Sequence, residues 1–155
     1  MKKSNLLLIF VILIILNINA QKSEFGIKAG VDFATVKVDG FGSASETGFF
    51  IGAFVTLGVS EKFAVQPELL YVSIKDLNFL SLPVLAKFSV ADKFNLLAGP
   101  SLNYFLDADE DEFKVNLDFG ATYDISSNLD INAKYSLGLS DVDINGLFFG
   151  LGYKF

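Results

Sequence analysis

The sequence predicts an all-β fold, an eight-stranded antiparallel up-and-down transmembrane β-barrel preceded by a cleaved signal peptide. Three observations predict it. The chain opens with a basic start and an apolar stretch, eight later segments alternate apolar and polar residues, and the last segment ends on an aromatic residue, Phe155. Alternation with a period of two is typical of a β-strand whose two faces meet different environments.

Residues 1–20 have the layout of a secretory signal peptide. Lys2 and Lys3 precede an uncharged apolar stretch from Leu6 to Leu16, and the small residue Ala20 offers a cleavage point before Gln21. A membrane anchor is the alternative, but a spanning helix needs about 20 apolar residues and this run is shorter. We therefore expect a signal peptide at 1–20 and one outer-membrane β-barrel domain at 21–155.

Composition excludes several classes of function. Cleavage changes the net charge from −6 to −8, because two lysines leave with the signal peptide. An acidic chain argues against nucleic acid as a partner, since nucleic acid attracts clustered Lys and Arg. The absence of Cys excludes a lipoprotein anchor, disulfides and thiolate metal sites. The chain is 52% hydrophobic, so the placement of its apolar residues decides the fold class.

Each predicted strand carries apolar side chains at every second residue and small, polar or charged ones between them. In chain order the apolar faces are Phe25 to Phe33, Phe49 to Val59, Phe63 to Tyr71, Leu80 to Phe88, Leu96 to Tyr104, Val115 to Ile125, Leu129 to Leu137 and Leu147 to Phe155. Their lengths suit tilted strands that cross a bilayer. Large aromatic residues fill these faces, so we expect them to meet lipid.

The connections predict the topology. Short polar turns lie at Val59–Phe63, Val90–Phe94 and Ile125–Leu129, and we expect generally longer loops at Val36–Glu46, Ser73–Asn78, Asp107–Phe113 and Ser140–Asn145. This asymmetry is typical of outer-membrane barrels, with the short turns in the periplasm. Pro67, Pro83 and Pro100 fall within strands and lack a ladder donor, which predicts local bulges.

Such a chain is expected to close on itself, since an unpaired backbone group in hydrocarbon costs several kcal/mol. Eight strands leave a lumen just wide enough for side chains to fill. Five cations and five anions fall on the inner face, and we expect them to form a paired, nearly neutral network. This lumen charge network comprises Lys28, Asp32, Glu68, Lys87, Lys114, Asp118, Asp124, Asp130, Lys134 and Lys154.

Five segments carry a resemblance to a known family. They are Phe25–Val31 (FGIKAGV), Gln66–Tyr71 (QPELLY), Leu82–Lys87 (LPVLAK), Ala98–Pro100 (AGP) and Gly150–Phe155 (GLGYKF). The chain resembles the PorT-like family of outer-membrane β-barrel proteins, common in the Bacteroidetes group. The resemblance implies a barrel similar in size to OmpA-like and OmpX-like barrels, located in the outer membrane of a Gram-negative bacterium. Most members have no assigned activity.

The C-terminus also resembles the signal that the barrel-assembly machinery recognises during insertion. Gly150, Tyr153 and Phe155 match that pattern, whereas Phe148 stands where a polar residue is expected. An exposed terminal strand can be captured by addition to a sheet edge of another protein. Alternatively, Tyr153 and Phe155 are only aromatic residues of the membrane interface, and both interpretations can hold together.

The chain contains no His and no Cys, which removes the usual nucleophilic triads and His-ligated metals. We expect no enzyme activity, no catalytic residue, no cofactor and no resident metal. Asp124 and Asp130 flank one turn and are interpreted as ion-paired lumen residues. Acidic residues crowd 107–112 and 141–145; Gly152 at the twelfth position excludes an EF-hand, and Asn145-Gly146 predicts a hairpin turn. A looser divalent-cation site between these loops is the alternative to solvated loops.

Three functional hypotheses follow. The first is a monomeric outer-membrane barrel with a side-chain-filled lumen, in contact with lipid, that has a structural or interaction role through its extracellular loops. The second is a narrow channel, or a transport or secretion accessory. The third is a secreted, soluble, lipocalin-like barrel that hides the Phe-rich faces and binds a small apolar ligand.

Overall fold

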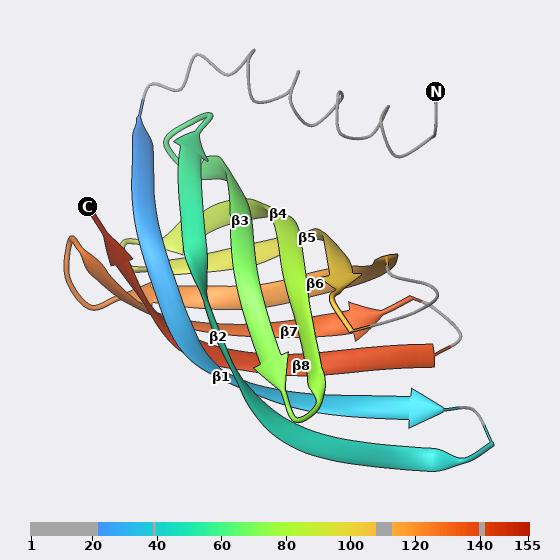
Figure 1. The fold of residues 1–155 in the computed structure, drawn as a ribbon. Coiled ribbons are helices and arrows are strands. Elements are labelled where there is room, and N and C mark those ends of the chain that lie inside the picture. Colours follow the sequence, from blue (N-terminus) through green and yellow to red (C-terminus); the bar gives the residue numbers. More distant parts are fainter. Residues whose placement is uncertain (1–21, 39, 108–112, 140–141) are drawn as a thin grey trace, which may run out of the picture.

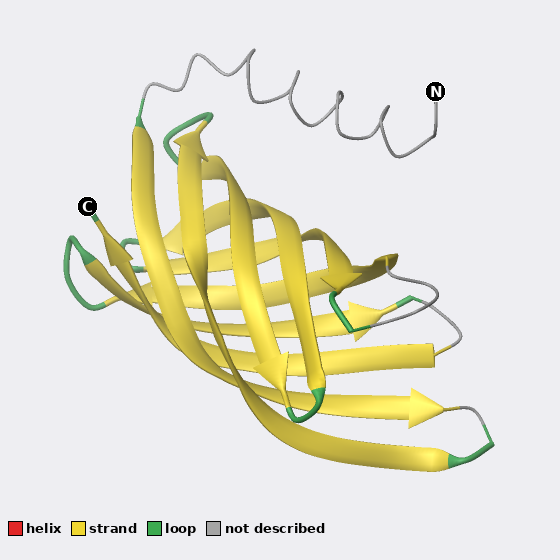
Figure 2. Ribbon diagram, in the orientation of Figure 1, coloured by secondary structure: helices red, strands yellow, loops and turns green. Residues whose placement is uncertain are grey.

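The protein forms one closed barrel of eight antiparallel strands in the computed structural model, which describes residues 22–38, 40–107, 113–139 and 142–155 (Figures 1 and 2). The strands are β1 (Ser23–Val38), β2 (Gly42–Gly58), β3 (Phe63–Ile74), β4 (Leu77–Ala91), β5 (Phe94–Phe105), β6 (Phe113–Asp124), β7 (Leu129–Gly138) and β8 (Val142–Lys154). The predicted fold class is confirmed. The predicted signal peptide at 1–20 lies outside the described residues.

The two faces of the wall agree with the predicted alternation. In β1, Phe25, Ile27 and Phe33 are exposed on the outside, whereas Lys28 and Asp32 are buried inside. The other strands likewise expose large apolar side chains on the outside and bury polar or charged ones inside, the reverse of a soluble protein. Because the aromatic residues lie outside and the charges inside, the lipocalin-like hypothesis is wrong. None of the described residues forms a helix long and apolar enough to cross a membrane.

β8 closes the barrel against β1. Gly30 of β1 pairs with Gly150 of β8, so two residues without side chains face each other across the closing seam. A Cβ at Gly150 would lie 2.5 Å from the backbone carbonyl oxygen of Ala29 and 2.7 Å from the ring of Phe50, which is closer than real contacts of a Cβ. Glycine at position 150 therefore allows β8 to approach the backbone of β1 and leaves room for the Phe50 ring inside the barrel.

The predicted proline bulges are absent. The pairing of β3 with β4 is in one register on both sides of Pro67, from Pro67↔Val84 to Leu70↔Ser81. A proline removes one ladder donor, but a one-residue slip would move every following side chain to the wrong face. The register shift in this part of the wall lies elsewhere, between Ser89 and Ala91.

The predicted long loops are also wrong in three of four places. Residues expected in the loop Val36–Glu46 belong to β1 and β2, with only 39–41 between the strands. Positive φ angles at Gly40 and Gly42 permit this tight connection. Lys75 and Asp76 alone separate β3 from β4, and the predicted hairpin turn Asn145-Gly146 lies within β8, opposite Thr35 and Ala34 of β1. Apolar alternation ends at the membrane boundary, whereas backbone pairing continues in water.

Three strands consequently extend past the rest of the wall. We call this extension the protruding ribbon: Thr35–Val38 of β1, Gly42–Thr47 of β2 and Val142–Asp143 of β8 (Figure 1, where β1 and β2 end at the lower right). Pairing of β2 with β3 begins only at Phe49↔Ser73. Gly42–Thr47 therefore has a paired neighbour on one side, β1, and a free edge on the other, whereas Gly48 already lies against Ser73 and Ile74 of β3.

Candidate functional site

The barrel interior is the richest concentration of polar chemistry in the described chain. Its two ends are named after the part of the chain that lies at each. The terminal end holds the start of β1 and the end of β8, and the ribbon end holds the protruding ribbon. A charged layer fills the middle, an apolar cluster lies toward the ribbon end, and an open vestibule lies at the terminal end.

The charged layer joins strands that are distant in the sequence. Lys28 Nζ of β1 lies 2.6 Å from Glu68 Oε1 of β3, and Lys134 Nζ of β7 lies 2.9 Å from Asp118 Oδ2 of β6. Lys134 also lies 3.8 Å from Glu68 Oε2, which links the two pairs. All four side chains are buried, so their mutual pairing offsets the cost of removing these charges from water.

Neutral side chains donate hydrogen bonds to one oxygen of each carboxylate. Ser101 and Ser136 donate hydrogen bonds of 2.9 and 2.6 Å to Asp118 Oδ1, and Gln66 Nε2 donates one of 2.7 Å to Glu68. The sequence analysis did not name the two serines. Alternation places them inside, but only the register, which sets Ser136 opposite Asp118, brings them to the carboxylate.

Toward the terminal end the predicted network is looser. Lys154 Nζ lies 2.8 Å from Asp124 Oδ1, and Asp130 accepts a hydrogen bond of 3.5 Å from Asn132. Lys87 is buried but forms no ion pair within the described ranges. The two aspartates that flank the turn 125–128 therefore have different partners. Toward the ribbon end, Asp32 and Lys114 line one small cavity with Phe148.

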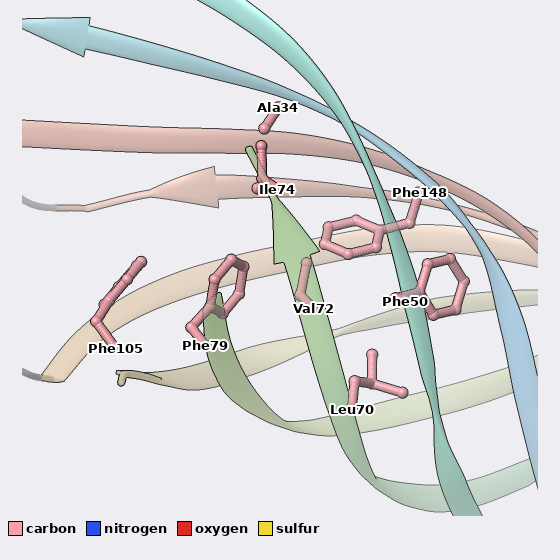
Figure 3. Close-up of a cluster of buried hydrophobic side chains, with 8 residues drawn as sticks. All are labelled: Ala34, Phe50, Leu70, Val72, Ile74, Phe79, Phe105 and Phe148. Carbon is pink, nitrogen blue, oxygen red and sulfur yellow. The ribbon is translucent and has the colours of Figure 1, made fainter. Parts of the chain in front are cut away.

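The apolar cluster fills the lumen near the ribbon end (Figure 3). Phe148, which the sequence analysis marked as a departure from the assembly pattern, packs edge-to-face on Phe50 with ring centroids 5.4 Å apart. Lys134 Nζ lies 4.9 Å from the centroid of the Phe148 ring, a cation–π distance. The buried members are Ala34, Phe50, Leu70, Val72, Ile74, Phe79, Phe105 and Phe148. The predicted charge network therefore accounts for only part of the filled lumen.

The vestibule is an open cavity of about 510 Å³ at the terminal end. Lys22 and Glu24 line it at the start of β1, Lys87 and Asn95 line it from β4 and β5, and Lys154 lines it from β8. The vestibule is open to solvent at this end, and none of the four ion-paired residues of the charged layer lines it. The ribbon end is filled by the apolar cluster instead.

The residues of the resembled assembly signal lie at the closing strand. Tyr153 and Phe155 are exposed on the outer face, with ring centroids 5.6 Å apart. The backbone N–H of Phe155 donates to the carbonyl of Phe25 at 2.9 Å. Gly150 lies on the inner face beside Phe50. The aromatic pair thus sits on the seam that joins the two ends of the chain.

The acidic loops are described only in part, because residues 108–112 and 140–141 lie outside the described ranges. Asp107 accepts hydrogen bonds from the backbone and side chain of Asn78 at 3.2 and 3.1 Å. Asn145 accepts one of 2.9 Å from Gly138 N–H. Within the part of the chain that the structure describes, no three acidic side chains are grouped as metal ligands. The cation-site hypothesis stays a prediction.

Comparison with known protein families covers nearly the whole chain. The family described as outer membrane protein beta-barrel domain has a model that matches residues 6–155. The chain belongs to this family. It is a transmembrane β-barrel of the outer membrane of a Gram-negative bacterium, in contact with membrane lipid.

Solved structures agree with the barrel fold. Ail, the attachment invasion locus protein of Yersinia pestis, is 21% identical with a TM-score of 0.59, over 87% of this chain and all (100%) of that one. Neisserial surface protein A is 18% identical with a TM-score of 0.56, over 87% of this chain and 100% of that one. OprG of Pseudomonas aeruginosa is 16% identical with a TM-score of 0.51, over 86% and 96%. No curated protein matches the chain. At these identities the likeness concerns the fold.

Proposed function

We propose that this protein is a monomeric, non-catalytic interaction barrel that presents the protruding ribbon to a partner at the cell surface. The observation that carries the proposal is the free edge of β2. Natural sheet edges are usually covered, shortened or blocked by Pro, Lys or bulges. Gly42–Thr47 has no Pro and no Lys, its residues are exposed, and it extends beyond the wall.

The edge has the dimensions of a peptide-binding strand. Its six residues, Gly42–Thr47, at about 3.3 Å each, make it about 20 Å long. Ser43, Ala44 and Ser45 are small, so a partner strand can approach the backbone closely. Phe41, 91% exposed, lies at the tip. Addition of an extended segment to such an edge is a recurring mode of recognition, with backbone hydrogen bonds supplying affinity.

The experiment uses a ribbon shortened in register. Deleting the paired residues Val36 and Ala44 together with Lys37 and Ser43 shortens the free edge without changing which face each remaining side chain takes. Peptides selected from a random displayed library against the protein in nanodiscs should protect the amides of Ser43–Thr47 from hydrogen exchange.

The matched control is Phe41→Ser, which alters the tip and leaves the edge. We expect the selected peptides to bind this control and not the shortened protein. Peptides that bind the shortened protein equally well, or that leave the β2 amides unprotected, would contradict the proposal.

Orientation and processing belong to the same proposal. An even number of strands returns both chain ends to one side, and we place this terminal end in the periplasm, with the ribbon end outward, because outer-membrane barrels carry their short turns on the periplasmic side. Residues 1–20 are removed as a signal peptide, leaving the barrel domain 21–155. The mass of the protein purified from outer membranes tests this, because retention of residues 1–20 would contradict it.

The PorT-like assignment within the broader family is also a proposal. It is supported by the segments FGIKAGV, QPELLY, LPVLAK, AGP and GLGYKF, each of which supplies a charged residue or a glycine to the inner face. A secretion or transport accessory role is the second candidate, and the open vestibule favours it. A through-channel fits less well, because the apolar cluster fills the lumen at the ribbon end.

A further inference from the structure

We propose that the vestibule at the terminal end binds a phosphodiester group, held by the ammonium of Lys87. The cavity of about 510 Å³ falls within the range of small-molecule sites, roughly 300 to 1,000 Å³. It is lined by side chains of both signs, and Lys87 enters it from β4. This site is independent of the protruding ribbon, which lies at the opposite end of the barrel.

Lys87 differs from Lys28, Lys134 and Lys154, the buried lysines for which an ion pair is described. Lys28, Lys134 and Lys154 each lie within 2.6 to 2.9 Å of a carboxylate oxygen. Lys87 is only 9% exposed, yet it forms neither a hydrogen bond nor an ion pair with any described residue. Burial of an ammonium without a partner is costly. Because Lys87 lines an open cavity, an anion from solution or from the membrane can supply the missing partner.

The acids near Lys87 limit how many negative charges the bound anion can carry. Asp124 is paired with Lys154 at 2.8 Å and Glu24 lies 3.8 Å from Lys22, so two of the three acids near Lys87 have cations of their own. Asp130 acts on Lys87 through space and has no ion pair in the described ranges. A doubly charged anion would be repelled by Asp130. A phosphodiester carries one negative charge and several acceptor oxygens, which suits one ammonium beside one carboxylate.

The position of the vestibule suggests where such a group comes from. Phe25 and Phe155 are exposed on the outer face at the terminal end, where aromatic residues mark the membrane interface. An apolar groove of about 490 Å³ runs along the outer wall beside them, bordered by Ala53, Pro67 and Leu69. An acyl chain in this groove would place a lipid phosphodiester close to the same rim. A soluble phosphodiester has the same head-group chemistry and enters directly.

The test titrates the protein in dodecyl maltoside with glycerophosphoglycerol, with dihexanoyl phosphatidylglycerol and with dihexanoyl glycerol, which lacks the phosphate. The readouts are the Lys87 side-chain NMR signal and the melting temperature. We expect a saturable shift and a higher melting temperature with both phosphodiesters and neither effect with dihexanoyl glycerol. Stronger binding of the lipid than of the soluble compound assigns the ligand to the membrane, and equal binding assigns it to the periplasm.

Variants separate the site from general charge effects. Lys87→Met should abolish the stabilisation, and Lys87→Arg should retain it. The control Lys93→Gln removes a lysine from the turn between β4 and β5 at the same end and should leave the stabilisation unchanged. Absence of a saturable shift in the parent protein overturns the proposal, as does equal stabilisation of Lys87→Met. If Lys87→Met fails to fold on a heat-shift gel, the parent titration and the Lys87→Arg variant decide.

Discussion

At the scale of single residues, Glu68 is the acid that lies near two lysines of the lumen among the described ion pairs. It lies 2.6 Å from Lys28 and 3.8 Å from Lys134, and it accepts a hydrogen bond from Gln66. Glu68→Gln would leave the buried ammonium of Lys28 without its carboxylate partner, whereas Lys134 would keep Asp118 at 2.9 Å. Removing one partner of a buried pair typically costs about 3 to 5 kcal/mol. We expect a loss of that order in the free energy of unfolding, measured by urea titration in detergent micelles.

The exposed acid Glu46 supplies the control for this substitution. Glu46→Gln on the protruding ribbon should leave the free energy of unfolding unchanged. The double variant Lys28→Met with Glu68→Met should recover part of the loss, since well-packed apolar replacements of a buried pair are often neutral. Equal stability of Glu68→Gln and the parent would show that the lumen pairs contribute nothing.

Phe148 supplies a second residue-scale prediction. Its ring is buried against Phe50 and Lys134, so Phe148→Ala would open a cavity at the centre of the apolar cluster. Truncation of a buried Phe costs about 3 to 5 kcal/mol. We expect a lower urea midpoint for Phe148→Ala and an unchanged one for Phe41→Ala at the exposed tip. Unaltered stability of Phe148→Ala would mean that the cluster is not packed as described.

At the scale of elements, β8 has two tasks that deletion of Phe155 can separate. In the finished barrel this residue adds one backbone hydrogen bond, to Phe25, and one aromatic contact, to Tyr153. If it also belongs to the assembly signal, deletion should reduce insertion in cells far more than it lowers the stability of barrels refolded in detergent. Equal yields of inserted mutant and parent would contradict the assembly role of Gly150, Tyr153 and Phe155.

The protruding ribbon is the element least coupled to the barrel. Its edge strand pairs with β1 alone, and pairing of β2 with β3 begins at Phe49. The shortened ribbon described above should therefore fold with a normal heat shift and a free energy of unfolding within about 1 kcal/mol of the parent, as for other surface changes. A large loss of stability would show that the ribbon supports the wall and is no independent binding element.

At the scale of the whole molecule, the lumen is open at one end and filled at the other. The vestibule opens at the terminal end, whereas the interior toward the ribbon end is occupied by Phe50, Phe79, Phe105 and Phe148. Eight-stranded barrels have interiors that side chains can fill. We expect no reproducible single-channel steps in planar bilayers containing the purified protein. Regular steps that persist across preparations would favour the channel hypothesis.

The alternation of residues determined the architecture because its two faces require different surroundings. From Phe25 to Phe155 the sequence alone showed that apolar side chains share one face, and backbone chemistry in lipid then required closure. The same alternation placed the lumen lysines and acids inside. It overestimated the loops, because polar residues such as Ser43 and Thr47 fit a loop or a strand in water equally well.

Tertiary structure alone decided which inner residues meet. Glu68, Lys28 and Lys134 come from three strands, and only the register and closure of the barrel bring them together. The apolar cluster and the charged layer are separate because their side chains lie at different positions along the barrel axis. Alternation says which face a residue takes, but it does not give that position. The free edge of β2, and the lack of an ion pair for Lys87 among the described residues, likewise depend on which strands and side chains lie next to them. The sequence determined which way each side chain points, and the three-dimensional pairing of strands decided what it finds there.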